Sequence, residues 1–157
     1  MIDENSLIKH YYAIANKLDD IMPVEWDKII MYAEETGTSS TPSFYFHAKD
    51  DDRFYYSKNI PEEFFISEDI FEELLLELKS CIKGLWYEFK RSGEKTWYTL
   101  TIRFEVTGKF DVEFGYKLDK EIDYYKRKLV WAYNELGILP VDKDDRGFVE
   151  EYVSKKL

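Results

Sequence analysis

The stretch from Ser67 to Arg91 constrains the fold more than any other part of this chain, because its large apolar residues keep a helical spacing throughout. These residues recur in steps of four and three, at Phe71, Leu75, Leu78, Ile82, Leu85 and Phe89. Leu74 and Trp86 widen the stripe, and charged residues occupy the other faces. A helix with such a broad apolar stripe needs a large apolar partner, so we expect it to lie on a sheet.

The ends of this central helix are also marked in the sequence. Ser67 is a suitable N-cap, since its hydroxyl can accept from the free N–H groups of the first turn, and Gly93 stands where a C-terminal glycine is common. Such a helix runs roughly 35 Å, about the length of a ten-residue strand. We therefore predict that it forms the main support of the core and that the hairpin at residues 97–116 packs against it.

The remaining elements follow from the same periodicities. Helical spacing predicts helices over residues 3–21, 119–136 and 144–156. Alternation and turn residues predict strands over residues 26–34, 44–48, 53–57, 97–106 and 110–116, with a loop at 37–42. The order α-β-β-β-α-β-β-α-α indicates an α+β fold. We expect one domain over residues 1–157, with an antiparallel sheet of about five strands and helices mainly on one face.

Charge and composition narrow the possible partners. The formal net charge is -10, which argues against nucleic acid or an anionic membrane as the ligand and favours a basic partner. Cys81 is the only cysteine, the N-terminus lacks the layout of a signal peptide, and no apolar run approaches the length of a membrane span. These features predict a cytoplasmic protein, and no pattern among them indicates an oligomeric state.

No set of residues in the sequence points to catalysis or to a cofactor. His10 and His47 lie on different elements without metal-ligand spacing, and Cys81 lies beside the apolar stripe with no identifiable base. The acidic run 50–52 is better explained as a solvated turn than as a cation site. There is no glycine-rich phosphate loop. We therefore expect a protein that is not an enzyme and that holds no metal or cofactor.

The distribution of acidic residues is more informative. Alternation places Asp111 and Glu113 on one face of their strand, with Glu105 on the polar face of the preceding strand. Tyr87 and Leu76 lie off the stripe of the central helix, so each either meets a neighbouring helix or touches a partner. Acidic residues among exposed tyrosines can hold a cationic protein, although ordinary solubility charge explains them equally well. The candidate partner-binding residues are Tyr87, Glu105, Asp111, Glu113, Asp142, Asp144 and Asp145.

Several segments resemble the YezG-like (EsaG-like) immunity proteins of Gram-positive bacteria, in the same order over nearly the whole chain. These segments are Ile21–Trp26 (IMPVEW), Tyr56–Pro61 (YSKNIP), Thr96–Leu100 (TWYTL), Thr107–Phe110 (TGKF), Trp131–Pro140 (WAYNELGILP) and Gly147–Tyr152 (GFVEEY). None of them is specific alone, but together they are.

The resemblance implies an antitoxin that binds and neutralises a cognate polymorphic toxin, commonly a nuclease exported by type VII secretion. It agrees with what the residues indicate independently. The chain has a strong negative charge, more aromatic residues than a core of this size is expected to bury, and no catalytic set of residues. The toxin partner would then be a basic nuclease domain. The alternative from another functional class is a small-molecule or regulatory binding module that uses the aromatic face of the sheet as its pocket.

Overall fold

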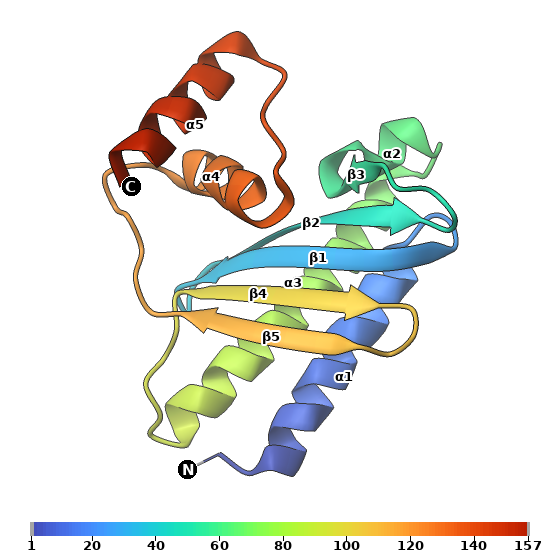
Figure 1. Cartoon of the computed structure of the whole chain (residues 1–157). Coiled ribbons are helices and arrows are strands. Elements are labelled where there is room, and N and C mark those ends of the chain that lie inside the picture. Colours follow the sequence, from blue (N-terminus) through green and yellow to red (C-terminus); the bar gives the residue numbers. More distant parts are fainter. Residues whose placement is uncertain (1, 157) are drawn as a thin grey trace. The chain divides into compact units, whose positions relative to one another are not determined.

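A five-stranded antiparallel sheet organises the first part of the chain, with strand order β3-β2-β1-β4-β5 (Figure 1). Its strands are β1 (Trp26–Glu35), β2 (Ser40–Ala48), β3 (Phe54–Tyr56), β4 (Thr99–Glu105) and β5 (Phe110–Gly115). Helices α1 (Glu4–Ile21) and α3 (Glu68–Arg91) lie side by side on one face of this sheet (Figure 1). The predicted α+β class and the predicted element order are confirmed.

The computed structural model describes residues 2–156. The chain divides into two units, a first unit that ends at Lys117 and a second that begins at Leu118. The first unit holds the sheet with α1 and α3, and the second holds two helices. The single domain expected from the sequence therefore stays a prediction.

The register of the sheet places one set of alternating residues on the face that α1 and α3 cover. Met31 in β1 lies opposite Phe44 in β2 and Ile102 in β4, and all three are buried against the helices. Because side chains alternate along a strand, the residues between them point to the other face. Ile30 and Tyr32 of β1 are buried on that face, so we call only its exposed part on the β4–β5 hairpin the open face. Arg103, Asp111 and Glu113 are on the open face.

Helix α3 forms as the sequence predicts. The Ser67 hydroxyl accepts from the backbone N–H of Ile70, which caps the first turn. The buried residues of this helix belong to the predicted stripe, and they are Phe71, Leu78, Ile82, Leu85, Trp86 and Phe89. Leu74 and Leu75 are partly buried against the same core.

The support of the β4–β5 hairpin differs from the prediction, because two helices share it. Near its C-terminus α3 reaches the hairpin through Phe89, whose ring centroid lies 5.0 Å from that of Phe114. At the other end of the hairpin Phe110 is met by Tyr11 of α1, with ring centroids 5.8 Å apart. Helix α1 packs along α3 and covers the part of the hairpin that α3 does not reach (Figure 1).

Two features of the first unit differ from the prediction, because contacts between distant residues override the local sequence signals. β2 begins at Ser40, inside the predicted loop, because the chain pairs with β1 from Glu35↔Ser40 onward and buries Pro42. The 3-10 turn η1 (Ser57–Asn59) and the short helix α2 (Ile60–Glu63) were not predicted. Ile60 in this segment is fully buried in the core, which holds the turn in place.

The second unit contains α4 (Tyr124–Leu136) and α5 (Lys143–Lys156). The predicted start of α4 at residue 119 is five residues too early, because Asp123 caps the helix by accepting from the N–H of Lys126. Gly137 ends α4 with φ +70°, as its position indicates.

Candidate functional site

The predicted acidic pair on the β4–β5 hairpin is bridged by an arginine. Arg103 Nη1 lies 2.6 Å from Asp111 Oδ2, and Arg103 Nη2 lies 3.5 Å from Glu113 Oε1. Both carboxylates are largely exposed on the open face, as the alternation predicts. Glu105, at the end of β4, lies 3.8 Å from Lys109 of the turn. The hairpin therefore carries negative charge that is partly neutralised by its own cations.

Arg103 is not among the predicted partner-binding residues, although the alternation of its strand includes it. It stands on the polar side of the same alternation that placed Glu105, and the register sets it opposite Asp111. Cross-strand pairs of opposite charge stabilise a sheet, so these acids have a structural partner as well as an exposed surface.

The acidic residues at 142–145 begin α5 in the second unit. Asp142 Oδ2 accepts from the N–H of Asp145 at 3.0 Å, and Asp144 and Asp145 lie in the first turn. Acidic groups at this end complement the helix dipole. Asp145 also accepts from the hydroxyl of Tyr125 at 2.6 Å. Each of these three acids therefore has a local role in its helix, and their contact with a partner remains a prediction.

Tyr87 and Leu76 differ in what they do on α3. The Tyr87 hydroxyl donates to the carbonyl of Gly37 at 3.3 Å, and Lys83 Nζ donates to the same carbonyl at 3.1 Å. Tyr87 is 40% exposed and thus helps to hold the β1–β2 connection while leaving part of its ring accessible. Leu76 is 61% exposed on the outer side of α3.

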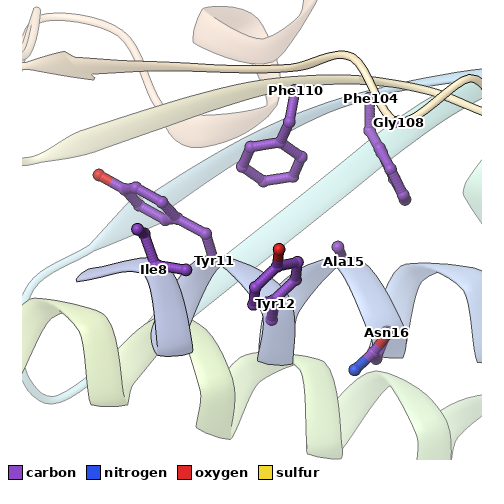
Figure 2. Close-up of a pocket in the computed structure, with 8 residues that line it drawn as sticks. All are labelled: Ile8, Tyr11, Tyr12, Ala15, Asn16, Phe104, Gly108 and Phe110. Atoms are coloured by element: carbon purple, nitrogen blue, oxygen red, sulfur yellow. The ribbon is translucent and has the colours of Figure 1, made fainter. Parts of the chain in front are cut away.

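An apolar hollow lies at a place the sequence did not single out. A groove of about 500 Å³ runs between α1 and the tip of the β4–β5 hairpin. Figure 2 shows Phe104 and Phe110 pointing from the strands toward α1, and Ile8, Tyr11 and Ala15 pointing from α1 toward the strands. The lining residues are Ile8, Tyr11, Tyr12, Ala15, Asn16, Phe104, Gly108 and Phe110.

Two large residues of α1 that line this groove are exposed to solvent. Tyr12 is 66% exposed and Ile8 is 41% exposed. Both lie beside the helical stripe formed by Leu7, Tyr11 and Ile14, and this neighbouring position is the signal that could have revealed them. Burial raises the pKa of the Tyr11 hydroxyl, with a smaller contribution from Tyr116, so Tyr11 remains neutral well into the alkaline range.

The structure shows how the histidine, cysteine and acidic groups considered for chemistry are placed within the described part of the chain. Within residues 2–156, no group of three or more histidine, cysteine or acidic side chains is placed to hold a metal ion. Asp51 accepts from the N–H of Arg53 and from the Tyr55 hydroxyl, and these bonds lower the pKa of its carboxyl. Burial raises the pKa of the Cys81 thiol, which disfavours the reactive thiolate. Across the described chain no helix is long and apolar enough to cross a membrane.

The sequence of this chain matches one family model and several known proteins. Residues 7–150 match the family model described as immunity protein YezG-like. Immunity protein YezG of Bacillus spizizenii is 38% identical over 145 residues, covering 91% of this chain and 90% of that protein. Its namesake in Bacillus subtilis is also 38% identical over 145 residues, covering 91% and 96% of the two chains.

A third relative comes from another genus. The type VII secretion system protein EsaG of Staphylococcus aureus is 29% identical over 153 residues, covering 96% of this chain and 94% of that protein. The matches span both units of the chain, and they agree with the resemblance seen in its short segments.

Proposed function

The chain belongs to the YezG-like family of immunity proteins, and we propose that it binds and neutralises a cognate secreted toxin, specifically a nuclease, in the cytoplasm of the cell that makes both. The match of the family model over residues 7–150 is the observation that carries this proposal. The Staphylococcus aureus relative is named a type VII secretion system protein, which supports export of the toxin by that route.

The charge of the chain supports a nuclease as the partner. A nuclease needs basic side chains to hold phosphates, and a surface with formal net charge -10 attracts such a protein at long range. Exposed carboxylates such as Asp111 and Glu113 add to this long-range attraction. Aromatic and aliphatic anchors in a closely packed region would supply most of the affinity.

The immunity protein acts by binding and not by catalysis in this proposal. Inhibition then needs one immunity protein for each toxin molecule. We expect nuclease activity to fall linearly as the protein is added and to vanish at a one-to-one ratio. Complete inhibition at a small fraction of that ratio would indicate an enzyme instead.

The central experiment uses the toxin domain encoded beside this gene. We expect the domain to co-purify with this protein, to lose binding in high salt, and to be harmless in cells only when the two are co-expressed. A toxin domain from an unrelated locus is the control. If the protein neither co-purifies with the neighbouring toxin domain nor protects cells that express it, the immunity proposal is wrong.

A small-molecule binding role has one observation in its favour. The groove of about 500 Å³ falls within the size range of ligand pockets. It lies between α1 and the hairpin, and Phe104 and Phe110 bring aromatic residues of the sheet into its lining. Its lining offers few convergent polar groups, which small ligands need for orientation.

A further inference from the structure

We propose that the groove between α1 and the β4–β5 hairpin, together with two acidic hollows that continue it, is the docking site for a basic amphipathic segment of the toxin. This inference rests on the proposed immunity function and assigns it a surface. The segment would place an aromatic or aliphatic side chain in the groove and lysine or arginine side chains along the acidic end.

The groove itself suits an apolar anchor. Phe104 and Phe110 form its wall on the hairpin side, with ring centroids 5.5 Å apart, and Tyr12 and Ile8 form the opposite rim (Figure 2). Helix α1 and the paired strands fix these walls before any partner binds. A preformed apolar hollow with partly exposed aromatic residues is typical of the region that carries most of the affinity in a protein interface.

The first acidic hollow adjoins the groove at the C-terminal end of α1. It has a volume of about 420 Å³ and is lined by Asp19, Met22, Val24, Glu25, Trp26, Asp27, Lys49 and Val106. Trp26 in this lining packs on Phe104 of the groove, with ring centroids 4.9 Å apart. Val106 follows β4, and its N–H donates to the carbonyl of Asp27 at 2.9 Å. The groove and the first hollow thus share a continuous wall.

The second acidic hollow continues from the first through Asp27, which lines both. Its volume is about 550 Å³, and its other lining residues are His47, Asp50, Asp51 and Asp52. Six carboxylates line the two hollows, against a single lysine, Lys49, which lies 3.6 Å from Glu25. Arg53 follows Asp52 in the chain, and its guanidinium carbon lies 4.4 Å from the centroid of the Tyr55 ring.

Several of these carboxylates are held in place by the fold. Asp19 accepts from Trp26 Nε1 at 2.8 Å, and Asp27 accepts from the N–H of Asp50 at 2.9 Å. Fixed acceptors cost little ordering free energy when a cation arrives. Glu25 and Asp52 are exposed, so both carboxylates are accessible to a lysine or arginine of the partner.

This distribution of charge selects the occupant. An apolar hollow that leads into six carboxylates matches a segment with one apolar face and a run of basic residues. A second copy of this chain would bring the same carboxylates and a net charge of -10, so it would be repelled at long range. An anionic lipid surface is excluded for the same reason.

The test measures binding of the neighbouring toxin domain to the intact protein and to variants with normal thermal stability. Tyr12→Glu and Ile8→Glu change exposed groove residues, and we expect each to weaken binding on the order of 30-fold. Leu76→Glu is the matched control, because Leu76 is 61% exposed on α3 and Tyr12 is 66% exposed on α1. Glu25→Gln with Asp52→Asn should slow association and reduce its dependence on salt.

The outcomes separate the two proposals. If the toxin domain does not bind the parent protein, the immunity proposal itself fails. If it binds the parent and both groove variants equally well, immunity stands and this docking site is wrong. Equal weakening by Leu76→Glu also overturns the site, since the effect is then not specific to the groove. Groove substitutions that change only self-association, measured by light scattering, would show that the occupant is a second copy.

Discussion

The carboxylate of Glu35, fully buried at the end of β1, lies 3.6 Å from the ammonium group of Lys83 on α3. The same carboxylate accepts from the N–H of Gly37 at 2.8 Å and from the Ser40 hydroxyl. Lys83 in turn donates to the Gly37 carbonyl. One buried acid therefore organises the β1–β2 connection and ties it to the central helix.

Removing this acid should destabilise the fold measurably. We expect Glu35→Ala to lower the free energy of unfolding by about 3 kcal/mol, because it leaves the partly buried donors of Gly37, Ser40 and Lys83 without this acceptor. Glu35→Gln keeps one carbonyl acceptor and should cost about 1 kcal/mol. Urea unfolding followed by circular dichroism measures both. Equal stability of Glu35→Ala and the parent would show that water satisfies these donors.

Replacing Gly37 by alanine should destabilise the fold more than replacing Gly93, although both glycines have positive φ. The φ of Gly37 is +91°, and an added Cβ would lie 2.8 Å from Cη2 of Trp86. Trp86 is held by the bond from its Nε1 to the carbonyl of Trp97 at 3.1 Å. Gly93 has φ +74° and no atom within 4 Å of an added Cβ, so Gly93→Ala is the matched control.

We expect Gly93→Ala to cost about 1 kcal/mol, the usual penalty of left-handed backbone for alanine. Gly37→Ala should cost about 3 kcal/mol, since steric overlap adds to that penalty. Thermal unfolding of the two variants and the parent gives the comparison. Similar melting temperatures for the two variants would mean that the Trp86 ring moves aside freely.

The hydrogen bond from the Tyr152 hydroxyl to Asp119 should make stability depend on pH at both extremes. This bond raises the pKa of Tyr152 to about 12 from its ordinary value of 10.0. Because the folded pKa is the higher one, the stabilisation is complete below pH 10.0 and is lost as the pH rises to about 12. The same bond lowers the pKa of Asp119 from 3.8, so that contribution is present above pH 3.8 and is lost in more acidic solution.

The variant Tyr152→Phe isolates this effect. We expect it to be less stable than the parent between pH 5 and 9 and equally stable near pH 12, where the parent has lost the bond. Free energies of unfolding at a series of pH values provide the test. A stability difference that stays constant from neutral pH to pH 12 would contradict the assigned bond.

Charge reversal on the β4–β5 hairpin distinguishes steering from contact. Asp111→Lys with Glu113→Lys removes two negative charges and adds two positive ones beside Arg103. We expect slower association with the toxin domain, strongest at low salt, and an unchanged dissociation rate. Surface plasmon resonance separates the two rates. Faster dissociation would place the hairpin face in the interface, as the sequence first suggested.

Local patterns were sufficient for most of the secondary structure. The stripe of α3, its Ser67 cap and the Gly137 end of α4 depend on residues close in sequence, and all three formed as expected. The start of α4 was misplaced because residues 119–122 have helical spacing, yet Asp123 offers a better cap. The turn at Ser57–Asn59 was missed because burial of Ile60 holds it, and burial of one residue leaves no periodic signal.

The candidate site was less accessible to such reasoning. Alternation placed Asp111 and Glu113 on one face, but their shared pairing with Arg103 needs the register between two strands. Predicting the groove requires knowing how α1 packs against the sheet, since α1 and the tip of the hairpin are about ninety residues apart in the chain. Nothing in either segment alone indicates that Phe104 would face Tyr12.

The sequence by itself determined the class of fold, the acidic character and the family, because periodicity, charge and short motifs are all properties of neighbouring residues. The tertiary structure decided that α1 shares support of the hairpin with α3, that Glu35 is a buried anchor, and that an apolar groove opens beside six carboxylates. These features arise from the packing of distant segments. The central helix at residues 68–91 thus revealed how the core is built, and the first helix borders the groove that we propose as the docking site.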